Sequence, residues 1–228
     1  MESTLPLLRL LQVTDSAFPV GGFAFSHGIE WLVQRGGATD EARLRETLRM
    51  YVQQVVGGQA LPSALAAARA RSVEAVRRVD VLLDASILPE AEREAGRLMG
   101  ERLLAGATAS FGGLGATSLL REVQEGLSPG QYATAFGVIA RDHGVPTATM
   151  LAALGSSMVG AVAQSAVRLT VIGQAAAARL IASAGPDVDV AVTSALARGR
   201  RGAVGAFAPG LDLAGLLHHT LPFRTFAS

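Results

Sequence analysis

The chain has 228 residues and a formal net charge of +1, and 50% of its residues are hydrophobic but only 5% aromatic. All 20 basic residues are Arg, and the lack of Lys and Cys excludes a Schiff-base lysine, a P-loop lysine, a disulfide and a thiol nucleophile. A net charge near zero gives no general attraction to nucleic acid or anionic membranes, so we expect neither as a partner.

Helical patterns dominate the N-terminal part of the chain. Leucines within residues 7–11 predict a short first helix. Thr39 and Asp40 predict the cap of a long helix, because apolar residues follow them at spacings of three and four. Leu61 and Pro62 predict the start of a new segment.

The middle of the chain continues this pattern. Pro89 is a favourable first-turn residue and predicts a further helix. The sequence FGGLGATS at 111–118 predicts a tight turn between helices, because a phosphate-binding loop of the Walker type would need a Lys. Ser128 and Pro129 predict another helix start, and Gly144 predicts its C-terminal stop.

A long uncharged segment follows at residues 144–167, which contain 24 consecutive positions without charge. That length would span a bilayer, but small residues dominate it and it lacks the Leu, Ile and Phe density of a spanning helix. We therefore predict the buried central helix of a soluble bundle. Gly185 and Pro186 predict the end of the next helix, and Asp189 predicts the cap of a short one.

No run of residues alternates between apolar and polar side chains as a strand would. The predicted fold class is therefore all-α, with residues 1–228 forming a single-domain helical bundle of about eight to ten helices around an apolar central helix. The mean hydropathy of +0.35 is high for a chain with few aromatic residues, so we also expect part of the surface to be covered by self-association.

The sequence FAFSHG at 23–28 loosely resembles a nucleophile elbow, with Ser26 in the place of the nucleophile. An elbow needs a preceding strand, and the helical surroundings favour Ser26 as the cap of a helix that begins at His27. We therefore predict no catalytic residue and no enzyme activity. A small helical hydrolase, or a ligand-binding protein with its site at the Ser26–His27 loop, is the alternative function.

Metal ligands and basic patches are sparse. The four histidines are His27, His143, His218 and His219. Adjacent residues on a helix point about 100° apart, so His218 and His219 would not hold one metal, and no carboxylate or Cys completes a ligand set by spacing. We predict no standing metal site in this chain, with a transient site shared with another chain as the alternative. A small basic cluster consists of Arg198, Arg200 and Arg201, which we interpret as a solvated loop, with a docking patch as the alternative.

The N-terminal stretch LLRLLQVTDSAFPVGGFAFSHGIE resembles the signature of the UreF family of urease accessory proteins. The matching residues are Gln12, Asp15, Ser16, Pro19, Gly21, Gly22, Ser26, Gly28 and Glu30. The resemblance continues in EREAGRLMGERLL, AFGVIARDHGVP, AVRLTVIGQ and FAPGLDLAGLLHH. Val171 replaces a usual Pro in the third of these, which would let the helix continue. In the tail, His219 and Pro222 replace the usual Glu and Tyr.

The resemblance implies an all-helical, dimeric, cytoplasmic protein that is not an enzyme. Such a protein is a scaffold of the urease maturation complex. It binds a UreD partner (also called UreH), and it recruits and regulates the UreG GTPase for nickel insertion into apo-urease. The resemblance also implies no cofactor in this chain, because the partner proteins mainly handle nickel and GTP.

Two segments are the expected partner-binding regions: an interaction loop at residues 15–30 and a docking tail at residues 218–228. Glu30 and residues 168–174 are expected to face the GTPase, and the tail is expected to become ordered by docking on the UreD-type partner. Phe18, Phe23 and Phe25 are expected to be core residues or partner anchors. The expected partner-binding residues are Asp15, Pro19, Gly21, Gly22, Phe23, Glu30, Arg168, Gln174, His218, Phe223, Arg224 and Phe226.

Overall fold

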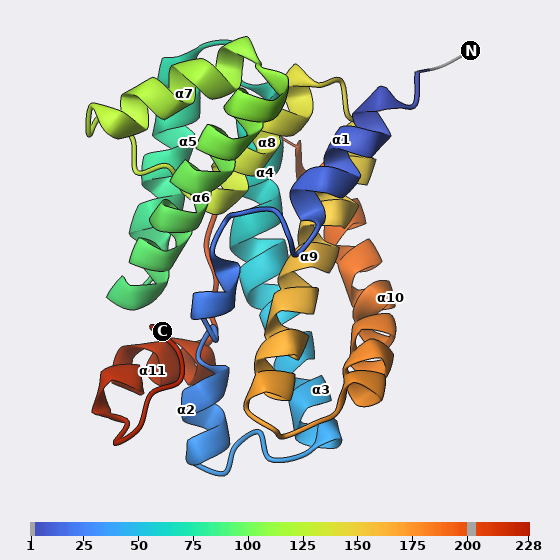
Figure 1. Ribbon diagram of the computed structural model, residues 1–228, viewed down its shortest axis with the longest axis vertical. Coiled ribbons are helices and arrows are strands. Elements are labelled where there is room, and N and C mark those ends of the chain that lie inside the picture. The colour runs from blue at the N-terminus through green and yellow to red at the C-terminus, as the bar shows by residue number, and fades with distance from the viewer. Residues whose placement is uncertain (1–2, 200–203) are drawn as a thin grey trace.

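The computed structural model describes residues 3–199 and 204–228, which fold into helices joined by short turns and contain no strand (Figure 1). The α-helices are α1 (Leu5–Thr14), α2 (Ile29–Gln34), α3 (Glu41–Tyr51), α4 (Leu61–Arg69), α5 (Val73–Ser86), α6 (Glu90–Phe111), α7 (Leu114–Gln124), α8 (Tyr132–Asp142), α9 (Thr147–Arg168), α10 (Gln174–Arg198) and α11 (Pro209–Leu217). The predicted all-α fold class is confirmed.

The most enclosed helix is α8, in which residues 133–140 are all buried. It packs against α4 and α6. Gly137 makes the approach to α4 possible, because a Cβ there would lie 2.2 Å from the carbonyl oxygen of Ala64. The segment predicted as the central helix forms α9, which buries one face against the core and packs along α10.

A π-helix, η2 (Val52–Ala60), joins α3 directly to α4. The prediction that Leu61 and Pro62 start a new segment is confirmed, because α4 begins at Leu61, although the helical backbone continues into it from η2. Pro is tolerated there because it lies in the first turn of α4. The π-helix packs against α10, where the Cβ of Ala191 lies 3.3 Å from the place a Cβ would take on Gly57.

Several predicted helix ends are confirmed. Asp40 caps α3, because its Oδ1 accepts a hydrogen bond of 2.9 Å from the backbone N–H of Arg43. Pro89 is the residue before α6, and Gly144 follows α8 in the left-handed conformation, with its N–H bonded to the carbonyl of Arg141. Glycines at 112 and 113 form the predicted turn between α6 and α7.

Other predicted ends are wrong. Helix α8 begins at Tyr132 rather than near Ser128 and Pro129, because residues 128–131 form a loop that is hydrogen-bonded to α5. Helix α10 runs through Pro186, since buried residues on both sides of that proline pack against the bundle. Asp189 therefore lies inside α10 and caps nothing.

The α9–α10 connection also differs from expectation. Helix α9 ends at Arg168 although Val171 replaces the usual Pro, because Thr170 takes a left-handed conformation with φ of 59°. At the far end of α10, Arg198 is exposed, whereas Arg200 and Arg201 lie outside the described residues.

Two helices, α9 and α10, are long and apolar enough to cross a membrane by length and composition alone. Half of the most apolar window of α9 is buried within the bundle. A core helix of a soluble protein passes the same test, so this finding is weak evidence for a membrane span.

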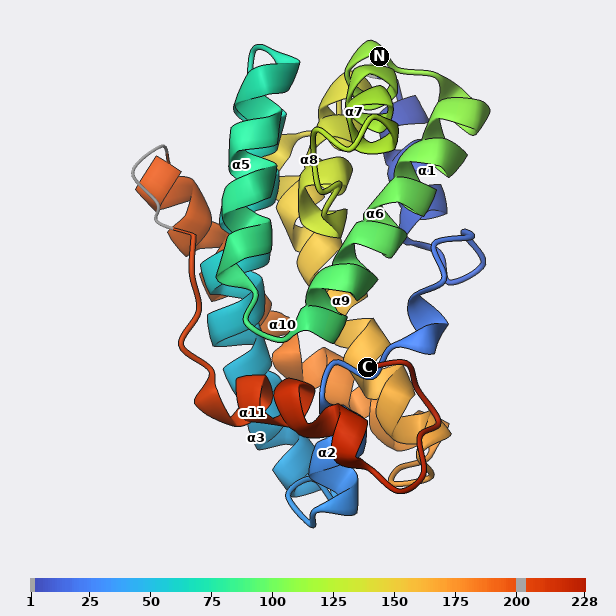
Figure 2. The same ribbon diagram turned by 90° about the vertical axis from the view of Figure 1, so that its left-hand side faces the viewer.

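The tail meets the last part of the interaction loop just before α2, whereas the first part of that loop lies against α6. Helix α11 crosses one end of the molecule and contacts α2, and the chain ends beside α2 (Figures 1 and 2). The connection from residue 15 to residue 28 runs from α1 to α2 along α9 (Figure 1), and it includes a short 3-10 turn, η1 (Gly22–Ala24).

Candidate partner-binding site

The loop before α2 is held in an unusual backbone conformation. His27 and Gly28 both have positive φ, 54° and 79°, so the helix begins at Ile29 rather than at the predicted His27. Ser26 still supports the first turn, because its Oγ accepts a hydrogen bond of 3.4 Å from the N–H of Glu30. The close approach of α11 also favours Gly28, since a Cβ there would lie 3.2 Å from the Cβ of Ala214.

The three phenylalanines of this loop have different environments. Phe18 and Phe25 are buried, and Phe18 packs against Gly106 of α6. Phe23 is 56% exposed. Phe18 and Phe25 are thus core residues, and only Phe23 is accessible as a partner anchor.

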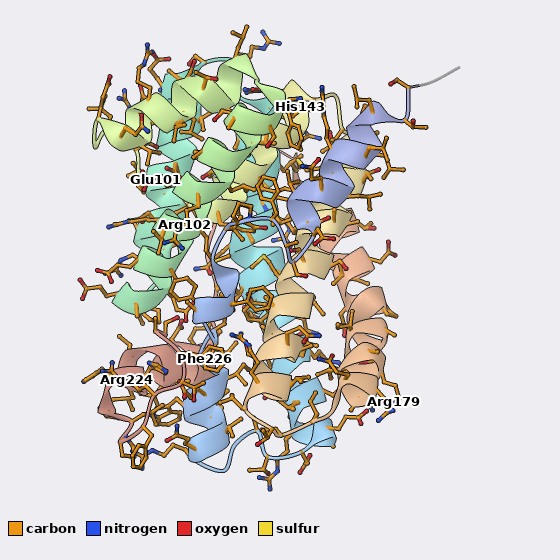
Figure 3. The ribbon with its side chains drawn as sticks, viewed as in Figure 1. Glu101, Arg102, His143, Arg179, Arg224 and Phe226 are labelled. Atoms are coloured by element: carbon orange, nitrogen blue, oxygen red, sulfur yellow. The ribbon has the colours of Figure 1, made fainter. Side chains whose placement is uncertain are left out.

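The C-terminal tail folds back onto this loop. The carbonyl oxygen of Ser228 accepts hydrogen bonds from the N–H and the Oγ of Ser26, at 2.7 and 2.6 Å, and Ala227 donates to the carbonyl of Ala24 at 2.7 Å. Phe226 is buried (Figure 3). The prediction that the tail is ordered only by docking on a partner is therefore wrong, because backbone hydrogen bonds within the chain already hold it.

Glu30 lies beneath the tail and is completely buried. Its Oε1 accepts a hydrogen bond of 2.6 Å from the N–H of Thr225, and its Oε2 accepts bonds from the N–H of Phe226 and from His218 Nε2, at 3.2 and 2.8 Å. Burial raises the pKa of Glu30, but the bonds from Thr225, His218 and Phe226 outweigh it and hold the pKa below its usual value. No part of the Glu30 side chain reaches the surface, so direct contact with a GTPase is excluded in this conformation, and a role in the GTPase-facing surface stays a prediction.

Arg168, at the end of α9, covers the tail from the other side. Its guanidinium carbon lies 4.2 Å from the ring centroid of Phe226 and 5.4 Å from that of Phe23. The guanidinium also donates a hydrogen bond to the carbonyl of Phe23. Burial lowers the pKa of Arg168, and within the described residues it forms no ion pair with a carboxylate. Arg168 thus stacks on aromatic rings and donates to a backbone carbonyl.

The remaining expected residues differ in accessibility. Phe223 is 82% exposed, and Arg224 is exposed beside it. Asp15, Pro19 and Gln174 are also exposed, and Gln174 bonds to the side-chain amide of Gln164 at 3.3 Å. Gly21 and Gly22 are half-buried near side chains of α6. The structure therefore joins Glu30, His218 and Phe226 in a buried group, with Phe23 and Arg168 over it.

Sequence reasoning missed a cavity of about 830 Å³ between the loop, α6 and α9. Its walls are mostly apolar and include the η2 residue Val55 and the α6 residue Met99. Glu92 lines it, and the Oε2 of Glu92 pairs with His27 Nδ1 at 2.9 Å. Burial lowers the pKa of His27, but Glu92 outweighs it and raises the pKa above its usual value. Glu92 gave no sequence signal, because it is one of several acids in the first turns of its helix.

The alternative functions can be tested against this geometry. Ser26 Oγ donates to the carbonyl of Ser228, and His27 pairs with Glu92, so these neighbours do not form the nucleophile–base pair that a hydrolase needs. The ligand-binding alternative would have to use the cavity beside His27. Within residues 3–199 and 204–228, no three side chains of His, Asp or Glu gather as a metal-binding group.

Comparison with known proteins places the chain among accessory proteins. A family model described as UreF matches residues 38–185. The chain is 37% identical to a urease accessory protein UreF of Arthrobacter sp. (strain FB24), over 97% of this chain and 96% of the relative. It is 35% identical to the protein of the same name from Kocuria rhizophila, over 97% of each chain. It is 31% identical to that of Corynebacterium efficiens over the whole of both.

Proposed function

Because this chain belongs to the UreF family of urease accessory proteins, we propose that it works as a non-enzymatic scaffold of a urease maturation complex. In this proposal it binds a UreD/UreH-type accessory protein, and it recruits and regulates a UreG-type GTPase for nickel insertion into apo-urease. The complex is cytoplasmic, and this chain needs no cofactor of its own because its partners handle nickel and GTP.

The observation that carries the proposal is the exposed pair Phe223 and Arg224 on an otherwise ordered tail. Both residue types are common anchors of protein interfaces. Phe223 is 82% exposed although its backbone is fixed, since its carbonyl accepts a hydrogen bond of 2.9 Å from Gln34 Nε2. A fixed backbone that presents an exposed ring supports docking of a partner with an apolar pocket.

The test is copurification of this chain with coexpressed UreD-type and UreG-type proteins. We expect both to be retained by the wild-type chain and the UreD-type protein to be lost from a Phe223→Asp variant. Phe207→Asp is the matched control, because Phe207 is 80% exposed but lies on another segment. Equal retention by both variants, or no retention by the wild-type chain, would contradict the proposal.

Self-association has a separate observation in its favour. Helix α1 exposes four leucines at intervals of one to three residues: Leu5, Leu7, Leu8 and Leu11. An apolar face of this kind marks a surface that another chain covers. We propose that two copies of this chain meet there. Light scattering should show a dimer for the wild-type chain and a monomer for a Leu8→Glu, Leu11→Glu double variant; a wild-type monomer would contradict this part.

A further inference from the structure

One buried acid accepts several of the hydrogen bonds that join the C-terminal tail to the rest of the molecule. Glu30 accepts three hydrogen bonds from the segment 218–226, and these donors lie 188 to 196 residues away from it in the sequence. Two of the three donors are backbone N–H groups, which any sequence in the tail would offer. The carboxylate is therefore the group on which these three bonds converge, and the side chains of His218 and Phe226 add to the attachment.

We propose that Glu30 is a positioning residue, a buried latch that holds the tail so that Phe223 and Arg224 are presented to a protein partner. The binding half of this inference rests on the proposed function, whereas the latch itself concerns this chain alone. The partner chemistry that fits is an apolar pocket bordered by a carboxylate, which would take the Phe ring and pair with the guanidinium.

The burial pattern along the tail supports this role. Leu221, Phe226 and Ser228 are buried, whereas residues 222–225 between them are all exposed. The latch bonds fall on Thr225 and Phe226, at the end of the exposed stretch. The tail is thus fixed on both sides of a short bulge, and the bulge carries the two presented side chains outward.

The electrostatics make the latch cooperative. A buried carboxylate is costly unless it accepts hydrogen bonds, and the buried N–H of Phe226 is costly unless it donates one. The Glu30 carboxylate and the Phe226 N–H bond to each other only while the tail is seated. The tail is therefore either seated or released, and a released tail would have to be ordered again whenever a partner binds, which weakens binding.

The first arm of the test measures tail order in the full chain by amide hydrogen exchange. Glu30→Gln keeps the shape of the side chain but replaces one carboxylate oxygen with an NH₂ group, so at least one of the three hydrogen bonds fails in either orientation of the amide. We expect about a tenfold or greater loss of protection at the N–H groups of Thr225 and Phe226, with α8 unchanged. Unchanged protection of the tail would overturn the latch.

Two further variants keep this arm decisive. Glu122→Gln is the matched control, because Glu122 is also a buried acid but lies on α7, away from the tail. It pairs with Arg77 of α5 at 3.3 Å. The tail protection of this variant should equal that of the wild-type chain. His218→Leu is the milder variant, for the case in which Glu30→Gln also lowers the protection of α8. It removes only one bond to Glu30, so it should lower the amide protection of the tail while α8 stays protected. Unchanged tail protection in His218→Leu would then overturn the latch.

The second arm measures capture of a coexpressed UreD-type protein. Glu30→Gln should reduce capture about tenfold in the wild-type background but much less in a Phe223→Ala background, because a positioning residue acts through the side chain it presents. Equal reductions in both backgrounds would overturn the positioning role. Failure of the wild-type chain to capture the partner would contradict the proposed function, while the exchange experiment would still decide the latch.

Discussion

Two completely buried carboxylates, Glu30 and Asp80, perform similar chemistry in different parts of the molecule. Asp80 on α5 accepts hydrogen bonds from the N–H groups of Gly130 and Gln131, at 2.5 and 2.9 Å, from Ser128 Oγ at 2.6 Å and from the hydroxyl of Thr134. These donors lie only 48 to 54 residues away, three in the loop between α7 and α8 and the fourth, Thr134, in the first turn of α8. Glu30 binds donors from the far end of the chain instead.

The difference lies in what else holds each bound segment. The loop that Asp80 binds is anchored by a helix on either side, whereas the segment that Glu30 binds has a helix only on its N-terminal side. The family-model match at 38–185 contains the whole Asp80 network and leaves out Glu30 and the tail. One buried acid therefore joins a loop inside the bundle to α5, and the other joins the tail to α2; we expect the tail to detach without unfolding the bundle.

The largest effect should follow from breaking the Asp80 network. Asp80→Ala leaves two backbone N–H groups and two hydroxyl groups without their acceptor in the core, and each such loss costs about 1–3 kcal/mol. We expect the free energy of unfolding to fall by about 3–5 kcal/mol in total, measured by urea denaturation followed by circular dichroism. Asp187→Ala is the control, because its pair with Arg49 is partly exposed and should contribute under about 1 kcal/mol. If Asp80→Ala lowered the free energy of unfolding as little as Asp187→Ala, the Asp80 network would not be essential to the bundle, and its distinction from the Glu30 network would fail.

A smaller effect should follow from disturbing the Asp80 network at a distance. A Cβ on Gly100 of α6 would lie 1.9 Å from the carbonyl oxygen of Gly130, in the loop that binds Asp80. Gly100→Ala should therefore lower stability by about 1–3 kcal/mol through overpacking, despite its better helix propensity. Gly160→Ala on α9 is the matched control, because no atom lies within 4 Å of the added Cβ, and it should stabilise by about 0.5–1 kcal/mol. Thermal unfolding should show a lower melting temperature for Gly100→Ala and a higher one for Gly160→Ala than for the wild-type chain.

At the tail, removing the stacked cation should have a more modest effect. Arg168→Ala loses the contact with the Phe226 ring, a type of interaction that contributes about 0.5–2 kcal/mol. We expect a loss near 1 kcal/mol in thermal unfolding, together with faster amide exchange in residues 225–228. Arg35→Ala, whose guanidinium lies 5.9 Å from the Trp31 ring on the surface, should change neither. The comparison requires that the tail loosens independently of the bundle. Faster amide exchange in α8 would contradict this.

The smallest global effect should come from acid. The pKa of Glu30 is lower in the folded chain than its usual value, so the ionised form favours folding, and this contribution is fully present above the unfolded pKa near 4.3. It is lost as the pH falls through the lowered folded pKa. We expect amide protection of Thr225 and Phe226 to decrease below about pH 4, before helical circular dichroism changes. Simultaneous loss of both signals would contradict a separately attached tail.

Local patterns predicted much of the bundle but little of the site. Asp40 and Pro89 were readable because a cap or a first turn depends on its immediate neighbours. Pro186 was misread because packing on both sides of it overrides a local preference. The role of Glu30 was hidden, since its partners lie at the other end of the sequence and two of them are backbone groups. Phe23 could not be separated from Phe18, because a loop has no periodicity that marks its buried face.

The π-helix η2 has a consequence for how the chain tolerates changes of length. Its hydrogen bonds reach from residue i to i+5, so the stretch Val52–Ala60 holds an extra residue compared with an α-helical path. Deletion of one residue from an α-helix rotates everything beyond it by about 100°. A deletion of the exposed Gln53 can instead be absorbed by tightening the π-helix into an α-helix, and we expect that variant to stay folded in thermal unfolding. The same deletion at Thr134 in α8 has no such reserve and should abolish the folded state.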